Sequence, residues 1–187
     1  MIENLIELDR EIFIYLNSLG KREYDFFWLV MTNKILNFTI YFIFSIIYLS
    51  KTNLKRFSLL VFTILLMILL TDQTTNFFKY SFSRLRPCHE EDLIGIIRLL
   101  KSSCGGLYGY FSAHASNSFA LASFFSMLYI KNGIKIPIFL ISVAVLVSYS
   151  RIYIGVHYPF DVISGAFFGI LSGYSFYLFS KKYLKVF

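Results

Sequence analysis

The chain has 187 residues, the length of one modest domain, but its composition is that of a membrane protein. Hydrophobic residues make up 57% of it, charged residues only 16%, and the mean hydropathy is +0.63. A soluble domain of this size cannot bury so much apolar surface, so the excess is expected to face lipid. The high aromatic content and the three prolines exclude disordered and collagen-like classes. The net charge of +7 does not indicate nucleic acid, because no basic run with spaced aromatics lies outside the apolar segments.

The N-terminal segment, residues 1–25, is predicted to form an amphipathic helix at the membrane interface. Apolar residues recur there at steps of three and four, which is typical of one helix face: Leu5, Leu8, Ile12, Tyr15 or Leu16, and Leu19. A cleaved signal peptide would begin with a basic region, whereas acids precede the first arginine here. We therefore expect this helix to remain on the protein.

Five apolar segments follow, each close to the length that crosses a bilayer as a helix. They cover approximately Phe26–Leu49, Phe57–Phe78, His114–Ile130, Ile134–Ser150 and Phe160–Phe179. No repeat or linker divides the chain, so residues 1–187 are expected to form a single domain. The predicted fold class is an all-α integral membrane protein, a bundle of about five transmembrane helices plus the N-terminal interfacial amphipathic helix.

The distribution of charge between the loops predicts the orientation. Eight basic residues and no acid lie in two alternate connections and the C-terminal tail: Lys51, Lys55, Arg56, Lys131, Lys135, Lys181, Lys182 and Lys185. Basic loops stay in the cytoplasm. The N-terminus and the loop over residues 79–110 are then expected outside, with the C-terminus in the cytoplasm.

Polar residues gather at the ends of spans on that outer face. They form three groups along the chain: Lys79 and Arg86; Ser112 and His114; and Arg151, His157 and Asp161. Guanidinium and ammonium groups bind phosphate oxygens and stabilise the negative charge that develops in phosphoryl transfer. The unpaired N–H groups at the start of a helix after Ser112 also favour an anion. We therefore interpret Lys79, Arg86, Ser112 and Arg151 as the phosphate-binding residues.

The imidazoles supply the reactive groups of this predicted site. His157 can attack phosphorus as a neutral imidazole if a partner fixes its tautomer, and Asp161 follows one helical turn later. Pro159 is typical of the first turn of a helix, which places His157 just before that helix. His114 remains to protonate the departing oxygen and then to activate water.

Together these residues resemble a known family of membrane enzymes. The patterns Lys79-x6-Arg86-Pro87, Ser112-x-His114 and Ser150-Arg151-x5-His157-x3-Asp161 are similar to the three motifs of the type 2 phosphatidic acid phosphatase superfamily, over about residues 57–180. The second motif departs from the family, which usually has Gly where this chain has Ala113. The resemblance implies the roles assigned above, with His157 as nucleophile, and no metal or cofactor.

The function expected from this resemblance is hydrolysis of a lipid phosphate or diphosphate through a phosphohistidine. The candidate substrates are undecaprenyl diphosphate, phosphatidylglycerol phosphate, phosphatidic acid and a lipid A phosphate. The expected location is the cytoplasmic (inner) membrane, with a multi-pass chain and the active site facing the periplasm or cell exterior. Two alternatives remain: a lipid phosphotransferase that uses the same site, and a non-catalytic membrane lipid-binding protein.

Three further features of the sequence carry expectations. Asp72, at membrane depth and two turns before Lys79, is interpreted as a partner of Lys79 or of a neighbouring span rather than as a catalytic group. The repeated GxxxG pattern fits either a homodimer face or close packing inside the bundle: Gly165, Gly169 and Gly173. Cys88 and Cys104 lie in one outer loop and are predicted to form a disulfide in an oxidising compartment.

Overall fold

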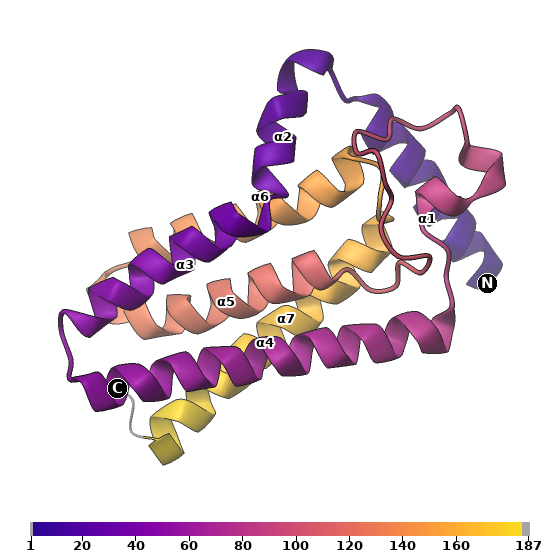
Figure 1. The fold of residues 1–187 in the computed structure, drawn as a ribbon. Helices are drawn as coiled ribbons and strands as arrows, with labels where there is room; N and C mark the ends of the chain where they lie inside the picture. Colours follow the sequence, from indigo (N-terminus) through magenta and orange to yellow (C-terminus); the bar gives the residue numbers. More distant parts are fainter. Residues whose placement is uncertain (1, 185–187) are drawn as a thin grey trace.

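The structure, a computed structural model, describes residues 2–184, which form helices and no β-strand (Figure 1). The α-helices are α1 Ile2–Ser18, α2 Asp25–Met31, α3 Lys34–Leu49, α4 Leu54–Phe82, α5 Ala113–Tyr129, α6 Lys135–Tyr153 and α7 Pro159–Phe179. Single turns supplement them: η1 Arg22–Tyr24, η2 Pro87–His89, η3 Glu91–Leu93, η4 Ile130–Asn132 and η5 Ser180–Leu184. The predicted all-α fold class is confirmed.

Long apolar helices make up the body of the molecule. Among the described residues, α4, α6 and the continuous stretch of α7 and η5 are long and apolar enough to cross a membrane, and α2 with α3 adds a fourth span if the bent pair counts as one. Helix α5 has 17 residues and packs mainly against α6 and α7, in the middle of the bundle. The chain is therefore a multi-pass membrane protein with a short central helix.

The first predicted span is not one continuous helix. The sequence indicated a helix over Phe26–Leu49, but the chain breaks near Asn33, and α2 and α3 meet at an angle of 50°. The Asn33 side chain accepts a hydrogen bond from the N–H of Ile35 at 2.8 Å and caps the start of α3. This cap starts a new helix inside a run of apolar residues, where hydrophobicity alone shows no boundary.

Helix α1 packs on the bundle through a face that the apolar pattern did not indicate. Leu5, Leu8 and Leu19 are about half exposed, which suits contact with a membrane interface. The buried positions are four residues apart instead and combine an acid, an aromatic ring and an amide: Asp9, Phe13 and Asn17. The amide of Asn17 donates to the backbone carbonyls at the end of α6, which anchors α1 beside the loop before α7.

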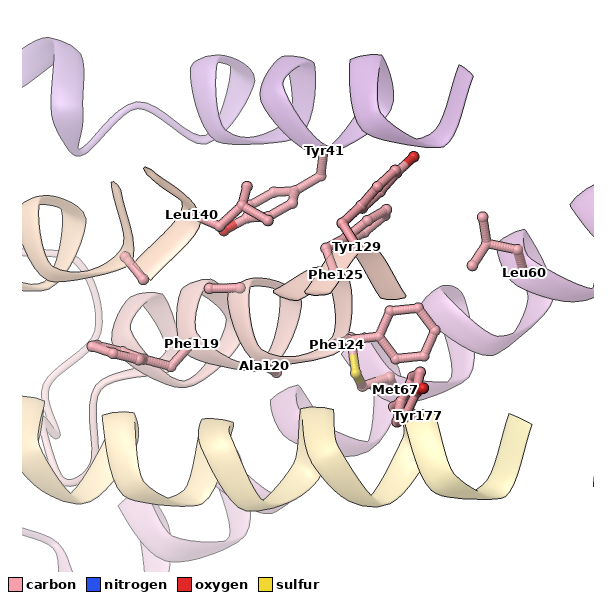
Figure 2. Close-up of a cluster of buried hydrophobic side chains, with 12 residues drawn as sticks. Tyr41, Leu60, Met67, Phe119, Ala120, Phe124, Phe125, Tyr129, Leu140 and Tyr177 are labelled. Atoms are coloured by element: carbon pink, nitrogen blue, oxygen red, sulfur yellow. The ribbon is translucent and has the colours of Figure 1, made fainter. Parts of the chain in front are cut away.

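The main hydrophobic core surrounds α5 (Figure 2). It combines side chains from five helices: Tyr41, Leu60, Met67, Phe119, Phe124, Phe125, Tyr129, Leu140 and Tyr177. The rings of Phe124 and Phe125 are fully buried: Phe125 packs against Tyr41 of α3, and Phe124 packs against Tyr177 of α7. This packing holds the start of α5 at a set position relative to α6 and α7.

The glycine stripe of α7 lies against α5 of the same chain. Its members are Gly165, Gly169 and Gly173. A Cβ added at Gly169 would lie 2.3 Å from the carbonyl oxygen of Ser116, and one at Gly173 would lie 2.2 Å from that of Ala120. The structure does not support the homodimer interpretation of this stripe, because the α5 backbone already occupies the face. The alternative, close packing inside the bundle, is confirmed.

The connections between helices lie at two opposite ends of the bundle (Figure 1). The α3–α4 and α5–α6 loops and the end of α7 share one end, which carries the basic residues predicted to be cytoplasmic; Lys185 lies outside the described residues. Helix α1, the loop over residues 83–112 and the α6–α7 loop share the other end. The three predicted polar clusters therefore meet on one side of the bundle.

Candidate active site

A cavity of about 940 Å³ brings the predicted clusters together. Its wall includes two imidazoles, five cations and one carboxylate: His114, His157, Lys34, Lys79, Lys101, Arg86, Arg151 and Asp72. Apolar side chains continue the wall between the helices: Leu29, Phe38, Tyr41, Ile68, Leu121 and Val147. The cavity thus joins a strongly positive region to an apolar one, as a phosphate on a lipid requires.

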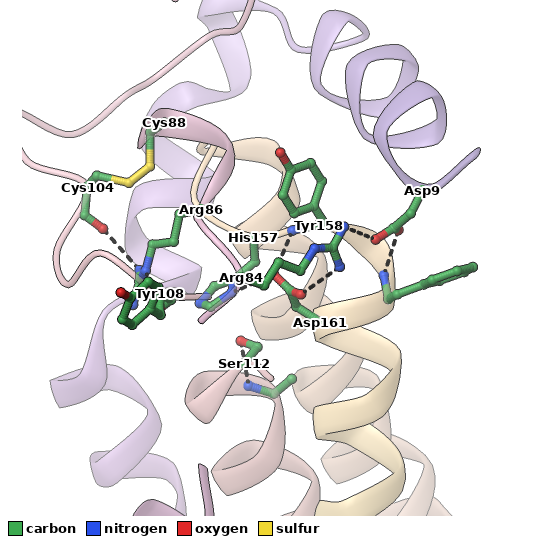
Figure 3. Close-up of polar contacts among 12 residues, drawn as sticks. Asp9, Arg84, Arg86, Cys88, Cys104, Tyr108, Ser112, His157, Tyr158 and Asp161 are labelled. Carbon is green, nitrogen blue, oxygen red and sulfur yellow. Dashed lines mark hydrogen bonds and ion pairs between the residues drawn. A yellow bond between two sulfur atoms is a disulfide. The ribbon is translucent and has the colours of Figure 1, made fainter. Parts of the chain in front are cut away.

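His157 and Asp161 form the most closely defined pair in this region (Figure 3). His157 lies in the α6–α7 loop, where Gly155 adopts a φ of +84° and Pro159 begins α7. Nδ1 of His157 is 3.3 Å from Oδ2 of Asp161, and the same oxygen accepts from the backbone N–H of Tyr158 at 3.1 Å. The carboxylate therefore favours a proton on Nδ1 and leaves Nε2 as the basic nitrogen.

The surroundings of His157 keep its imidazole neutral. The side chain is almost fully buried, and burial lowers its pKa well below 6.5, with a further lowering by the positive charges of Arg151, Arg86 and Lys79. A neutral imidazole is the form that can attack phosphorus. The cations that would hold a phosphate thus also keep the predicted nucleophile in its reactive form.

Arg86 is held at the cavity wall by the backbone of its own loop. Its Nε donates to the carbonyl of Tyr108 at 3.2 Å, and its Nη1 donates to the carbonyl of Cys104 at 3.0 Å. The structure joins Cys104 to Cys88 by a disulfide, with Cα atoms 6.1 Å apart (Figure 3). The covalent link and the two hydrogen bonds together define where the guanidinium of Arg86 lies.

Arg151 and Lys79 enter the cavity from two membrane helices. Arg151 is 5% exposed, donates from Nη1 to the hydroxyl of Thr32, and has a buried Nε without a hydrogen-bond partner among the described residues. Lys79 reaches the wall from the last turns of α4. A buried donor without a partner is costly, so the Nε of Arg151 is suited to a ligand oxygen.

Ser112 has a different place from the one its predicted role requires. Its side chain is fully buried, and its hydroxyl accepts from the N–H of Ala115 at 3.5 Å, as the N-cap of α5. The next two residues, Ala113 and His114, line the cavity, whereas Ser112 does not. Its hydroxyl therefore defines where α5 begins, and the direct phosphate contact stays a prediction.

Asp72 contacts a neighbouring span, in agreement with its interpretation as a supporting group. Its Oδ1 accepts from Nδ2 of Asn117 on α5 at 2.8 Å, and the neighbouring Thr71 donates to Oδ1 of the same asparagine at 2.5 Å. The contact joins α4 to α5 at the depth of the cavity.

Two polar residues that sequence reasoning missed lie behind the His157–Asp161 pair. Arg84 forms an ion pair with Asp161 at 3.1 Å and another with Asp9 of α1 at 2.7 Å (Figure 3). Asp9 is fully buried; burial raises its pKa, against the lowering effect of a hydrogen bond from the N–H of Phe160 and of Arg84. The available signal in the sequence is the spacing of Asp9, Phe13 and Asn17, which lie four residues apart and so share one face of a helix.

This arrangement defines the class of protein: a helical membrane enzyme whose cavity presents a histidine–carboxylate pair and several cations to a phosphate. A family model described as the PAP2 superfamily matches residues 56–185. The chain therefore belongs to the PAP2 superfamily, the family that its three motifs indicated.

Curated relatives extend the similarity over nearly the whole chain. The Lipid A 4'-phosphatase of Porphyromonas gingivalis is 34% identical over 187 residues, covering 97% of this chain and 78% of that protein. The Lipid A 4'-phosphatase of Bacteroides thetaiotaomicron is 33% identical over 184 residues, with 97% and 81% coverage.

Two solved structures share the fold. The PAP2 type phosphatidylglycerolphosphate phosphatase from Bacillus subtilis has a TM-score of 0.78 at 18% identity, covering 96% of this chain and 88% of that chain. Aquifex aeolicus LpxE has a TM-score of 0.65 at 26% identity, with 94% and 96% coverage. The first likeness concerns the fold alone. The expected membrane helical architecture is confirmed by both.

Proposed function

We propose that the protein hydrolyses a lipid phosphate in two displacements, through a covalent phosphohistidine at His157. The chain is a lipid phosphatase, as its family and its curated relatives establish. The observation that carries the proposed mechanism is the buried His157–Asp161 pair at the wall of a cavity rich in cations.

In the first displacement, Nε2 of His157 attacks phosphorus, the N–P bond forms, and the bond from phosphorus to the lipid oxygen breaks. His114, which takes up a proton as the anionic substrate enters the cavity, donates this proton to that oxygen, so the lipid leaves as an alcohol or as a phosphate with one group fewer. Asp161 stabilises the positive charge on the phosphorylated imidazole. Arg86 and Arg151 stabilise the charge on the phosphoryl oxygens.

In the second displacement, water attacks the same phosphorus atom and the N–P bond breaks. His114, now neutral, takes a proton from that water and so returns to the state in which it began. His157 is released as a neutral imidazole that keeps its proton on Nδ1. Inorganic phosphate leaves the cavity, and the net reaction consumes one water molecule.

For the substrate, we propose a phosphorylated lipid of the lipid A type. The curated relatives over 97% of the chain are Lipid A 4'-phosphatases. The cavity also carries two cations beyond the predicted clamp, Lys34 at the start of α3 and Lys101 in the loop, which line it together with His114. In this mechanism His114 faces the leaving oxygen, and we propose that these lysines bind the leaving-group side of the substrate. They suit a lipid that carries more negative charge than one phosphate.

The proposed orientation places the cavity at the outer face of the cytoplasmic membrane. It is supported by the basic loops at the opposite end of the bundle and by the oxidising environment that a disulfide beside Arg86 requires. The N-terminus would then lie outside. Labelling of single cysteines placed at residues 7 and 131 with a membrane-impermeant reagent in intact cells tests this orientation.

The test of the reaction is phosphate release by the purified protein in EDTA, from a lipid A bisphosphate, phosphatidylglycerol phosphate, phosphatidic acid and undecaprenyl diphosphate. We expect phosphate release from the preferred lipid and no release by His157→Ala. With a lipid that carries labelled phosphate, the wild-type protein should itself become labelled, through a bond that is labile in acid and stable in alkali. His89→Ala is the matched control, because His89 lies in the loop and outside the cavity wall.

Three outcomes would contradict this proposal. Phosphate release that persists in His157→Ala would exclude His157 as nucleophile. Release abolished by EDTA would indicate a metal-dependent reaction. Transfer of the labelled phosphate to a second lipid, with none released to water, would indicate the phosphotransferase.

A further inference from the structure

Arg84 bridges two buried carboxylates that come from opposite ends of the sequence. Its Nη1 is 3.1 Å from Oδ1 of Asp161, and its Nη2 is 2.7 Å from Oδ2 of Asp9 (Figure 3). Both carboxylates are fully buried, while the Arg84 side chain is 20% exposed. Its guanidinium carbon lies 4.1 Å from the centroid of the Tyr158 ring, which holds the plane of the guanidinium.

The oxygens of Asp161 are divided between the nucleophile and Arg84. Oδ2 faces Nδ1 of His157 and the N–H of Tyr158, whereas Oδ1 faces Arg84. A buried carboxylate needs a positive partner to stay ionised, and His157 is neutral before the reaction. Arg84 is therefore the cation that contacts this carboxylate directly in the resting enzyme, at 3.1 Å.

Asp9 prevents Arg84 from cancelling the charge of Asp161. Arg84 paired with Asp161 alone would be a neutral pair, with little negative potential at the imidazole. With Asp9 the three side chains carry a net charge of −1, which can stabilise the positive charge that forms on His157. Asp9 is held in place because its Oδ1 accepts from the N–H of Phe160 in α7 at 2.8 Å.

We propose that Asp9 and Arg84 are positioning residues, which hold Asp161 ionised and directed at His157, and that helix α1 thereby completes the active site. The proposal rests on the proposed role of His157 as nucleophile. Asp9 lies outside residues 56–185, the part matched by the family model. Arg84 occupies one of the six positions between Lys79 and Arg86 at which the first motif specifies no residue type.

Helix α1 is built to make this contact from the membrane surface. Phe13, one turn after Asp9, packs edge-on against the ring of Tyr158, with ring centroids 5.3 Å apart. On its other side, α1 leaves Leu5 and Leu8 about half exposed, toward the membrane interface. Docking of α1 and the position of Asp161 therefore depend on the same few contacts.

The test compares Asp9→Asn and Arg84→Gln with Arg84→Lys and a matched control. In the control, Arg10→Gln, the adjacent α1 residue loses an exposed ion pair with Asp92. We expect Asp9→Asn and Arg84→Gln to lower kcat on the order of ten- to a hundredfold, with KM changed less than about threefold, because substrate phosphate is bound elsewhere. Arg84→Lys should recover part of kcat, and Arg10→Gln should leave it unchanged.

A double variant separates positioning from simple loss of folded protein. If both residues act through Asp161, Asp9→Asn combined with Arg84→Gln should lower kcat little more than either change alone. Thermal unfolding of each detergent-purified variant monitors folding, and Arg84→Lys remains informative if Arg84→Gln does not fold.

Two results would overturn the proposal: kcat of folded Arg84→Gln and Asp9→Asn within about twofold of wild type, or losses that multiply in the double variant. The same experiment measures phosphohistidine formation by the wild-type protein. This measurement distinguishes failure of the positioning proposal from failure of the proposed function. If it forms in the wild type while Asp9 and Arg84 prove irrelevant, only the positioning proposal fails.

Discussion

Nδ1 of His157 lies 3.3 Å from Oδ2 of Asp161. In the sequence, the histidine precedes Pro159, the first residue of α7, and the aspartate follows it. Pro159 preorganises the first turn, so the imidazole before it and the carboxylate within it meet without a contribution from another helix. The pair is local in sequence. Arg84 and Asp9, in contrast, reach it from distant parts of the chain.

The first prediction concerns the protonation of His157. Burial and the nearby cations lower its pKa well below 6.5, so we expect the imidazole to stay neutral at pH values below 6.5 in the folded protein. The unfolded chain binds a proton there at about pH 6.5, so this residue should make the protein less stable as the pH falls below that value. Nitrogen NMR of histidine-labelled protein in detergent, with His157→Gln for assignment, measures the titration. A midpoint at or above pH 6.5 would contradict the described surroundings.

The second prediction concerns the loop that carries Arg86. Replacing Cys88 and Cys104 by Ser should lower the free energy of unfolding by about 3 kcal/mol, the chain-entropy value for a loop of this size. It should also lower kcat/KM, because the carbonyl of Cys104 holds Arg86. Reductant should destabilise the wild type and leave the double variant unchanged. Free thiols detected in denatured, unreduced wild type would refute the pairing.

The third prediction concerns the contact between α5 and α7. Gly169→Ala should lower the free energy of unfolding by about 1–3 kcal/mol, because the added methyl would meet the backbone oxygen of Ser116 at 2.3 Å. Gly106→Ala is the control, since nothing lies within 4 Å of its added Cβ. Thermal unfolding measures both. Cross-linked dimers that disappear in Gly169→Ala at unchanged stability would restore the dimer interpretation.

The fourth prediction concerns the two additional lysines of the cavity. Lys34→Gln and Lys101→Gln should each lower kcat/KM roughly tenfold, corresponding to about 1.4 kcal/mol, for a lipid A bisphosphate. The effect on a monophosphorylated lipid should be much smaller, because that substrate has no second anionic group to lose a contact. Lys51→Gln and Lys55→Gln, at the other end of the bundle, are the controls. Equal losses on both lipids would assign these lysines to the first phosphate instead.

The sequence was sufficient for features that depend on composition and short spacing. The apolar segments predicted a membrane bundle because a span needs only a continuous run of apolar residues. The spacing of His157 and Asp161 predicted their contact because four residues make one helical turn. Convergence of Lys79, Arg86 and Arg151 followed from the sidedness of alternate loops, and all three line the cavity.

Other features could not be predicted because they depend on which helix faces pack together. The GxxxG pattern in α7 can pack against a helix of another chain or of the same chain. Only the position of α5 decides between these two possibilities. The break at Asn33 depends on a single side-chain cap within an apolar run. Ser112 is hidden by the packing that brings α5 against α7.

By itself, the sequence determined the class of fold, the family, and the local pair of His157 with Asp161. The tertiary structure decided that Asp9, 152 positions before Asp161, belongs to the same polar network through Arg84. The physical reason is burial. A carboxylate on an amphipathic helix is indistinguishable in sequence from a solvated one, and only packing of α1 against α7 removes it from water and gives it an arginine as partner.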